Sequence, residues 1–439
     1  MISSLSLKNY RGFSACDFEL RPITLLLGPN NSGKSAAMSA LKLLSQTIES
    51  YDRSVTLLLN GKYGDFGTYK DLVHKNVVQK PMSIGMSVTS RAKSVEGASK
   101  VVSSTLGFKF NAPQKRIELH SSIFSVDGVE QAAFERDGKG GELKLKSVLG
   151  REPTAEIKRR IKDRISFFHF LPNSIWLGGR GGDMDKVSKG QLNALEALQP
   201  NLRSIYSSLI NLDYLSALRL APSRTYAYSG EQHKKIGASG ENSMSILAMN
   251  SLSKSGKGAA MVSAVTAWLK SSGMAKDVRV KDLAGRFFEV QVNHPSSDFH
   301  QNIADVGFGI SQVMPVLVGG LNCSRGSTFL VEEPEIHLHP RAQAELGDFF
   351  LRLKGSGVQV IAETHSEHLV LRLLQYVASG RLKPEDIVFY SVQGVDCGCG
   401  VEKIEVDEKG MFLSDWPSGF FPERLNEAKK LALARASSK

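Results

Sequence analysis

The sequence predicts an α/β fold in which a mainly parallel sheet is assembled from both ends of the chain and is joined by an antiparallel β subregion and a helical insertion. Near the N-terminus, a continuous apolar run over residues 23–27 leads through a cluster of turn formers into a segment with helical spacing. In the last third of the chain, strand-like and helix-like segments alternate. This order is typical of strands that pair in parallel.

Hydrophobic periodicity divides the 439 residues into four ranges. Residues 1–80 form the N-terminal half of the parallel-sheet domain, and residues 285–439 form its C-terminal half. Residues 81–150 contain short alternating runs separated by Gly and Asp turns, which predicts antiparallel strands. Residues 151–284 are mainly helical in pattern. They lack sustained heptads, so we expect no long coiled-coil arm.

The composition is that of an ordinary globular protein, with 41% hydrophobic and 23% charged residues. The first residues lack a basic segment followed by an apolar run, and no stretch has the length of a membrane helix. We therefore expect a cytoplasmic protein without a membrane partner. Cys16, Cys323, Cys397 and Cys399 match neither a disulfide framework nor paired zinc knuckles, so we expect free thiols.

The formal net charge of +11 suits a protein that meets polyanions. The densest basic cluster lies within residues 158–164. A solvated basic surface explains the same charge, so nucleic-acid binding stays an open alternative at this point.

A glycine-rich loop follows the first apolar run. Residues 28–35 have the pattern G-x-x-x-x-G-K-[ST] between a strand and a helix, which is the position that a phosphate-binding loop requires. Loop amides and the helix N-terminus would meet the negative charge of a triphosphate, Lys34 would reach its β and γ phosphates, and the hydroxyl of Ser35 would ligate Mg²⁺. The predicted nucleotide-binding residues of this loop are Asn30, Asn31, Ser32, Gly33, Lys34 and Ser35.

Carboxylates follow a second apolar run, residues 328–331. Ligands of open α/β sheets bind at the carboxyl ends of strands, so these side chains are placed for chemistry. We predict that Glu332 takes the Mg²⁺, directly or through water, and that Glu333 orients and activates the attacking water. Glu335 is interpreted as a surface or helix-start acid.

A third apolar run, residues 358–362, leads to His365 at the same sheet edge. A histidine there can hydrogen-bond the γ-phosphate or the attacking water, so His365 joins Glu333 as a predicted catalytic residue. His337 and His339 lack a third ligand for a metal. We expect His339 and Pro340 to end a turn and to begin the next helix.

Two further segments resemble the ABC-ATPase superfamily, specifically its soluble branch with SMC, RecF and overcoming-lysogenization-defect ATPases. Residues 5–13 resemble the opening strand and turn of that branch, and residues 305–312 resemble its signature motif. The resemblance implies that Gly309, Ser311 and Gln312 contact a nucleotide held by the opposite subunit of a homodimer or higher homo-oligomer. The segment departs from the transporter signature, in which two glycines follow the serine.

The C-terminal half resembles a group of bacterial ATPases with three motifs, which are residues 332–340, 363–368 and 415–421 here. Relatives of this type, including the PtuA-like ATPases of Septu systems and retron-associated ATPases, act in anti-phage defence with nuclease partners. The resemblance implies ATP and Mg²⁺ as cofactors and a separate effector protein such as a nuclease, because this chain has no acidic nuclease cluster of its own.

Three functions compete on the sequence alone. The first is a defence ATPase whose ATP-dependent dimer controls a separate effector. The second is an SMC-like or RecF-like ATPase of DNA repair or maintenance, which the basic charge favours and the missing coiled coil disfavours. The third, a transporter subunit, is disfavoured by the form of the signature segment.

Overall fold

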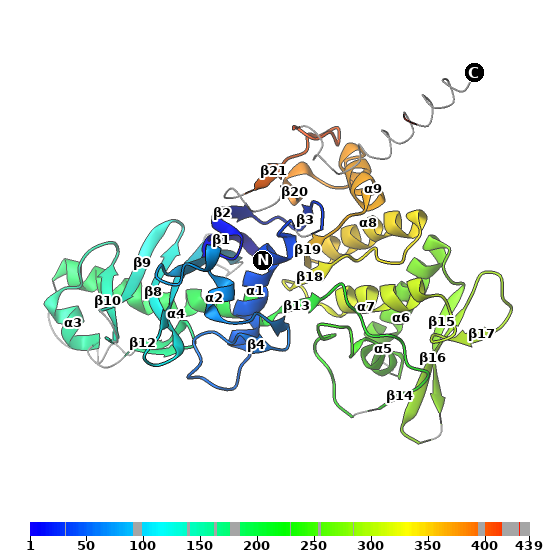
Figure 1. Ribbon diagram of the computed structural model, residues 1–439, viewed down its shortest axis with the longest axis horizontal. Coiled ribbons are helices and arrows are strands. Elements are labelled where there is room, and N and C mark those ends of the chain that lie inside the picture. The colour runs from blue at the N-terminus through cyan, green and yellow to red at the C-terminus, as the bar shows by residue number, and fades with distance from the viewer. Residues whose placement is uncertain are drawn as a thin grey trace. The chain divides into compact units, whose positions relative to one another are not determined.

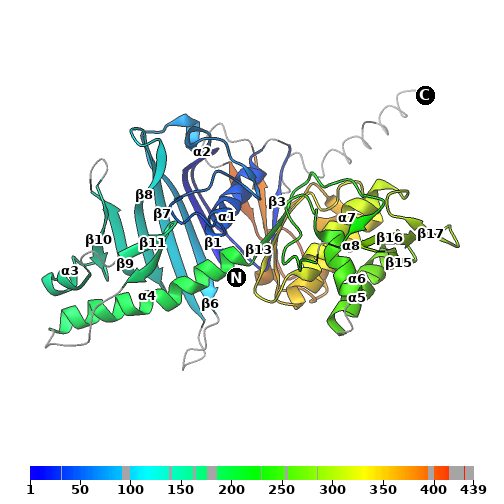
Figure 2. The ribbon, with the colours of Figure 1, turned by 90° about the horizontal axis from the view of Figure 1, so that it is seen from below.

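The computed structural model describes residues 1–430 except 31, 91–98, 138–140, 162–164, 176–184, 229, 253–255, 284, 394–399 and 415–429. These residues form two compact units, drawn in Figures 1 and 2. The first takes residues 1–20 and 36–212, and the second takes residues 21–35 and 213–393 and those after 399. The second unit therefore joins segments that are far apart in the sequence. The two units do not follow the four sequence ranges, and those ranges stay a prediction.

The first unit is built on a seven-stranded antiparallel sheet in the order β10-β9-β8-β7-β6-β1-β2. Its strands are β1 (Ile2–Tyr10), β2 (Phe13–Glu19), β6 (Met82–Ser90), β7 (Lys100–Asn111), β8 (Arg116–Val126), β9 (Val129–Arg136) and β10 (Leu143–Val148). The expected antiparallel strands over residues 81–150 are thus present. They pair with the opening strand β1 through β6.

The remaining elements of the first unit are short, apart from two helices. The 15-residue helix α1 (Lys34–Ile48) begins in the second unit and continues into the first. The 25-residue helix α4 (Lys186–Ile210) packs across β6, β7 and β9 of the sheet (Figure 2). The short elements are β4 (Asn60–Gly61), β5 (Gly64–Asp65), α2 (Tyr69–Leu72), the 3-10 helix η1 (His74–Asn76), α3 (Ala155–Ile161), β11 (Ile165–Phe168) and β12 (Leu171–Ile175).

In the basic cluster of residues 158–164, the described cations Lys158, Arg159 and Arg160 pair with acids of the first unit, and residues 162–164 lie outside the described residues. Lys158 Nζ lies 2.5 Å from Glu152 Oε1. Arg159 and Arg160 both bind Glu156, at 2.6 Å each. The described part of the cluster therefore presents less net charge than the sequence suggests, and it gives no specific support for polyanion binding.

The cysteines differ in part from the expectation of free thiols. Cys323 is free, as expected, and burial raises the pKa of its thiol. Cys16 is disulfide-bonded, so the expectation is wrong for this residue. Cys397 and Cys399 lie outside the described residues. Spacing along the chain cannot reveal such a bond, because it depends on which strands are brought together.

The second unit is built on a six-stranded sheet in the order β13-β18-β19-β3-β20-β21. Its strands are β13 (Leu212–Leu215), β18 (Thr328–Glu332), β19 (Gln359–Glu363), β3 (Ile23–Leu27), β20 (Ile387–Val392) and β21 (Val401–Ile404). β18, β19, β3 and β20 run parallel, and β21 pairs antiparallel to β20. The apolar run 23–27 is the fully buried strand β3 between β19 and β20, which confirms a parallel sheet assembled from both chain ends.

Helices and a smaller sheet complete the second unit. The helices are α5 (Ser243–Leu252), α6 (Gly256–Ser272), α7 (Phe308–Asn322), α8 (Pro340–Gly355), α9 (Glu367–Ala378) and the 3-10 helix η2 (Pro384–Asp386). The smaller antiparallel sheet contains β14 (Tyr226–Ala227), β15 (Asp277–Leu283), β16 (Phe287–Asn293) and β17 (His300–Asn302). α8 and α9 lie side by side (Figure 1), and α7 is buried over most of its length. This mixed α/β architecture confirms the predicted fold class.

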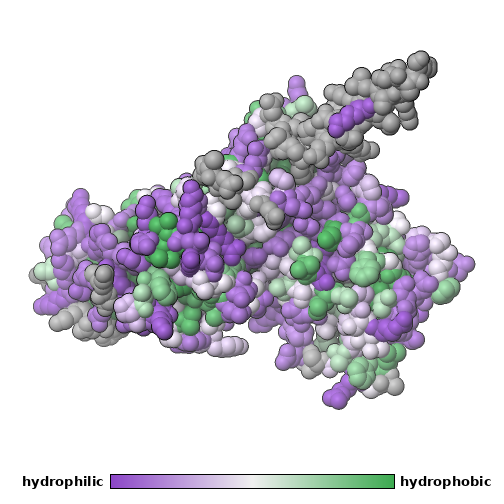
Figure 3. All heavy atoms as spheres, in the orientation of Figure 1, coloured by the Kyte–Doolittle hydropathy of each residue, from purple (hydrophilic) through white to green (hydrophobic). Residues whose placement is uncertain are grey.

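The visible surface is mostly hydrophilic, with separate small apolar patches (Figure 3). Among the described residues, none of the helices combines the length and the apolar character that crossing a membrane requires.

Candidate functional site

The site lies at the carboxyl end of the parallel strands of the second unit. β3 ends at Leu27, and the glycine loop leads directly into α1. Gly28 has a φ of 145°, and a Cβ there would lie 2.3 Å from the carbonyl oxygen of Val392. Only glycine fits this close approach, which explains the first glycine of the motif. Asn30 is exposed and Ser32 is buried, whereas Asn31 lies outside the described residues.

Lys34 is enclosed by its own loop. Its side chain is 2% exposed, and its ammonium donates to the carbonyl oxygens of Gly28 at 2.9 Å and of Pro29 at 2.7 Å. Glu363 Oε1 lies 3.6 Å away. Burial lowers the pKa of Lys34, and the negative charge of Glu363 opposes that shift. The ammonium is therefore held at the mouth of the glycine loop, where a phosphate would compete for it.

Ser35 is exposed at the start of α1 and donates its hydroxyl hydrogen to Glu363 Oε2 at 2.8 Å. Burial raises the pKa of Glu363, while the Ser35 hydrogen bond acts in the opposite direction. The sequence analysis assigned no role to Glu363. It is the last residue of β19 and pairs in register with Glu332 of β18, so both carboxylates emerge at the same level of the sheet. A serine hydroxyl beside carboxylates is a donor set that suits Mg²⁺.

Glu332 is oriented by the neighbouring edge strand. Tyr214 of β13 hydrogen-bonds the Glu332 carboxylate, and burial together with that negative charge raises the pKa of the tyrosine hydroxyl. Glu332 was the predicted Mg²⁺ ligand, but the serine of the glycine loop binds Glu363 instead. The two carboxylates thus differ in their partners: one holds the loop serine and the other is held by a tyrosine.

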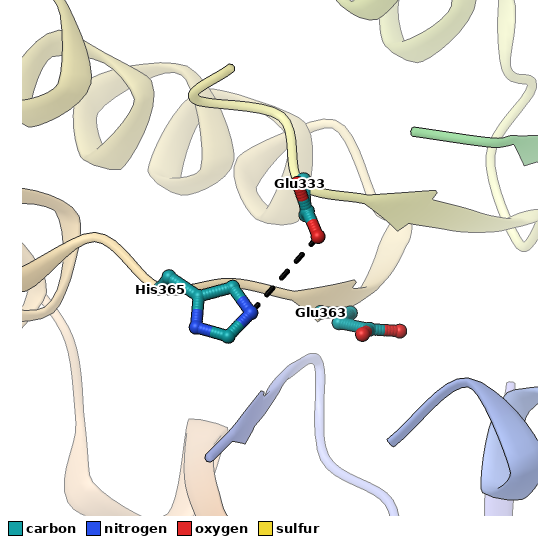
Figure 4. Close-up of side chains that lie close together, drawn as sticks. All are labelled: Glu333, Glu363 and His365. Carbon is teal, nitrogen blue, oxygen red and sulfur yellow. Dashed lines mark ion pairs between the residues drawn. The ribbon is translucent and has the colours of Figure 1, made fainter. Parts of the chain in front are cut away.

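Glu333 and His365 face each other across the ends of β18 and β19 (Figure 4). Glu333 Oε1 lies 3.9 Å from His365 Nε2, and both side chains are about one-third exposed. Glu333 has a φ of 42°, and its backbone N–H donates to the carbonyl oxygen of Glu363 at 2.8 Å. Burial lowers the pKa of His365, and the charge of Lys34 lowers it further. The pair therefore combines a carboxylate with an imidazole that is biased toward its neutral form, as general base chemistry requires.

The carboxylates of Glu333 and Glu363 and the imidazole of His365 offer three ligand atoms within 4.8 Å of one another (Figure 4). Glu333 and His365 were predicted catalytic residues, and the structure brings them together. It adds Glu363, which the sequence analysis left without a role. A carboxylate that directly precedes Thr364 and His365 at a strand end is the signal by which it could have been found.

Glu335 is not the surface acid that the sequence suggested. It is 7% exposed, and its Oε1 accepts hydrogen bonds from Thr364 Oγ1 at 2.7 Å and from the backbone N–H of His365 at 2.6 Å. Burial raises its pKa. The residue folds inward because it follows Pro334 in a turn and finds two donors on the next strand end. Glu335 thus fixes the loop that presents His365.

We expect Glu335→Ala to destabilise the protein by about 2 kcal/mol, because two donors beside β19 lose their acceptor. Glu335→Gln keeps an amide oxygen that can accept both hydrogen bonds, so its effect should be much smaller. Thermal unfolding followed by circular dichroism measures both variants. Equal melting temperatures for the two variants would contradict this role of Glu335.

The signature-like segment lies at the start of α7. Gly307 is the N-cap, and Phe308 is 63% exposed. Ser311 and Gln312 are 3% and 5% exposed, and the Ser311 hydroxyl donates to the carbonyl oxygen of Phe308 at 2.9 Å. Ser311 therefore lies one turn inside the helix rather than at its free N-terminus.

Gly309 is half-buried in the same segment, and a Cβ there would lie 2.8 Å from the carbonyl oxygen of His337. The contacts predicted for Gly309, Ser311 and Gln312 across a dimer stay a prediction. His339 is the N-cap of α8 and accepts from Ala342, as the sequence indicated.

Among solved structures, the SMC head bound to the C-winged helix domain of ScpA is 11% identical to this chain. The match covers 93% of this chain and 98% of that SMC head, with a TM-score of 0.46. The SMC head domain from Thermotoga maritima is 9% identical, with coverages of 92% and 99% and a TM-score of 0.39. The Pyrococcus furiosus SMC head with an extended coiled coil, bound to the C-terminal domain of ScpA, is 9% identical, with coverages of 92% and 96% and a TM-score of 0.41.

No curated protein matches the chain. A protein family described as an AAA ATPase domain matches residues 1–117 and 183–370, which is more than half of the chain and includes the glycine loop, both carboxylate-bearing strand ends and α7. The chain therefore belongs to the AAA ATPase domain family.

Proposed function

We propose that the protein binds and hydrolyses ATP and that ATP binding pairs two copies of the chain, which in turn regulates a separate effector. The observation that carries the hydrolysis proposal is the convergence of Lys34, Ser35, Glu333, Glu363 and His365 at one end of one sheet. A loop that binds phosphates and a carboxylate that can activate water have to meet for this reaction.

Each side chain has a chemical task in this proposal. Lys34 exchanges the carbonyl oxygens of its own loop for terminal phosphate oxygens, which carry a full negative charge. Glu333 accepts a proton from the attacking water. His365, 3.9 Å from Glu333, donates a hydrogen bond to a phosphate oxygen or to that water.

The donor set fits Mg²⁺, which would neutralise phosphate charge when bound. Ser35 and the carboxylates of Glu332 and Glu363 are the residues that would hold it. The Ser35 hydroxyl has one hydrogen and two lone pairs, so its oxygen would ligate the metal while the hydrogen stays bonded to Glu363. The local change that we expect on nucleotide binding is therefore at Lys34, whose ammonium turns from loop carbonyls to phosphate oxygens.

Pairing of two copies is proposed from the segment at the start of α7. Gly307 and the exposed Phe308 present the N-terminus of a 15-residue helix to solvent, and backbone amides at such a terminus attract anions. The resemblance of residues 305–312 to a signature motif is the ground for assigning this anion to the nucleotide of a second copy. The buried Ser311 would contribute by holding the first turn of α7, because its hydroxyl donates to the carbonyl oxygen of Phe308.

The effector is proposed to be a nuclease of anti-phage defence, because residues 332–340 and 363–368 resemble motifs of defence ATPases. The alternative is an ATPase of DNA maintenance, which the net charge of +11 favours. The ion pairs of Lys158, Arg159 and Arg160 with two carboxylates weaken that alternative, since they offset part of the positive charge in the described residues of the densest basic cluster.

The purified full chain tests the proposal directly. We expect release of phosphate from ATP that depends on Mg²⁺ and is abolished by EDTA. When ATP and Mg²⁺ are present and turnover is slow, we expect sedimentation to show that the mass of the particle increases from one copy to two. ADP should not increase the mass, because it lacks the γ-phosphate that joins two copies. Hydrolysis without any change in mass would refute pairing, and neither binding nor hydrolysis would refute the ATPase proposal.

A further inference from the structure

A short segment after β13 crosses the second unit close to the site. We call residues 216–226 the arginine strap, because Arg219 and Arg224 make its main side-chain contacts. Its backbone is fixed: the N–H of Leu220 donates to the carbonyl oxygen of Ser239 at 3.0 Å. The strap is thus an ordered connection rather than a loose loop.

Arg219 joins two elements that carry different parts of the site. Its Nη1 donates to the carbonyl oxygen of Gln312 in α7 at 3.1 Å. Its Nη2 donates to the carbonyl oxygens of Glu332 at 2.9 Å and of Glu333 at 2.8 Å. Burial lowers the pKa of Arg219 to about 10, so the guanidinium is charged at neutral pH. Among the described residues, its hydrogen-bond partners are all main-chain carbonyls.

Arg224 binds the other end of the same signature-like segment. Its Nη1 and Nη2 donate to the two carboxylate oxygens of Asp305 at 3.0 Å and 2.5 Å. The carbonyl oxygen of Arg224 accepts from the side chain of Asn302 at 2.8 Å. The strap therefore holds the segment 305–312 at its first and last residues and holds the end of β18 as well.

The geometry of the guanidinium matters for this link. A planar guanidinium has two Nη atoms at a fixed separation, which lets one group bind carbonyls on two elements at the same time. A lysine ammonium is a single point with a flexible stem and cannot keep both distances. The backbone of Glu333 also has a positive φ, a conformation that the surroundings have to maintain. Three hydrogen bonds supply that support: two from Arg219 Nη2 to the carbonyl oxygens of Glu332 and Glu333, and one from the N–H of Glu333 to the carbonyl oxygen of Glu363.

We propose that Arg219 is a positioning residue, which couples the start of α7 to the carboxylate end of β18, so that a change at the signature-like segment alters the orientation of Glu333. This inference rests on the proposed ATPase function. It assigns to Arg219 no contact with nucleotide. Because Glu333 lies one residue beyond the end of β18, a rotation of its backbone moves its carboxylate as well.

The first test is the steady-state kinetics of Arg219→Lys and Arg219→Ala. We expect kcat to fall by at least about tenfold in both variants, because displacing a catalytic group by about 1 Å can cost on the order of 100-fold. The affinity for ATP, measured by calorimetry, should change by less than about threefold, since Lys34 and the glycine loop are untouched. If lysine restores the parental kcat, only charge is needed and the coupling role is wrong.

Arg21 offers a matched control on the same sheet. Its Nη1 donates to the carbonyl oxygens of Pro384 and Ile387 at 3.0 and 2.9 Å, and its Nη2 binds Glu405 at 2.8 Å. Arg21→Lys removes a similar set of hydrogen bonds from the opposite end of β3 and β20. If Arg219 had only a structural role, both variants would have a lower melting temperature and the same kcat as each other. We expect instead that kcat falls in Arg219→Lys and not in Arg21→Lys.

Hydrogen–deuterium exchange tests the coupling independently of hydrolysis. In Arg219→Lys, peptides that cover residues 305–314 and 330–338 should both exchange faster than in the parent, and neither should change in Arg21→Lys. Faster exchange in only one of the two segments would overturn the coupling. If the parent itself shows no ATPase activity, the proposed function fails, while the exchange result still decides whether Arg219 joins the two segments.

Discussion

Lys34→Ala should abolish nucleotide binding, with a loss of affinity of at least about 100-fold, or about 2.7 kcal/mol. The Lys34 side chain is 2% exposed, and its ammonium donates to the carbonyl oxygens of Gly28 and Pro29. It is therefore already oriented at the loop where a triphosphate would be bound, and its side chain pays little additional conformational entropy on binding. Isothermal titration calorimetry with ATP and Mg²⁺ measures the loss, and phosphate release should fall to background.

The control for this experiment is Lys354→Ala. Lys354 is also partly buried and paired, with Asp386 at 2.6 Å, but it lies at the end of α8 and outside the site. The Lys354→Ala variant should bind ATP with the affinity of the parent protein. Because Lys34 also holds the loop together, the melting temperature of each variant has to be compared. A folded Lys34→Ala protein with parental affinity would remove Lys34 from the nucleotide site and would contradict the proposed function.

The parallel sheet and its glycine loop were predictable because their signals are local. A continuous apolar run predicts a strand that is buried on both faces, and β3 is buried at all five positions. The loop motif needs only eight successive residues, and the carboxylates of Glu332 and Glu333 directly follow an apolar run. In each case the residues that carry the chemistry are adjacent in the sequence to the residues that form the strand.

The parts of the site that were missed depend on strands that meet only in the fold. Glu335 has the sequence context of a surface acid, and it is buried because Thr364 and His365 supply donors from the segment that follows β19. Glu363 gains its role from the register of β19 with β18 and from Ser35, which is more than 300 positions away in the sequence. Arg219 stands between two exposed leucines and belongs to no motif. Long-range pairing of this kind leaves no periodic pattern.

The signature-like segment illustrates a different limit. Its resemblance implied a nucleotide contact for Ser311, which would suit a serine at a free helix N-terminus, where a hydroxyl can meet an anion. The helix begins three residues earlier, at Phe308, and the Ser311 hydroxyl is used by the carbonyl oxygen of that residue. Sequence patterns define helix ends less well than helix cores, because an end depends on a cap and on neighbouring packing.

Glu333→Gln should preserve ATP binding and slow hydrolysis by about 100-fold to 10,000-fold, the contribution expected of a positioned general base. The amide has nearly the shape of the carboxylate but does not accept a proton. The backbone contacts at this position, to Glu363 and Arg219, do not involve the side chain and should persist. Single-turnover measurements separate the chemical step from binding and product release.

The same variant should lengthen the life of the ATP-bound pair of copies, because pairing is expected to end when the γ-phosphate is cleaved. Sedimentation with ATP and Mg²⁺ should therefore show a larger fraction of dimer for Glu333→Gln than for the parent. Glu385→Gln is a suitable control, since Glu385 is an exposed acid in η2 that pairs with Lys383 and has no place in the site. It should hydrolyse ATP at the parental rate.

Two outcomes would reassign the base. If Glu333→Gln hydrolyses ATP at the parental rate, another group accepts the proton, and Glu363 is then the strongest candidate because it lies within the same group of ligand atoms and binds Ser35. If instead Glu333→Gln fails to bind ATP, its carboxylate serves nucleotide binding rather than chemistry. A slow variant that still binds ATP and dimerises fits only a Glu333 that acts on water, because binding, pairing and chemistry are then separated in one protein.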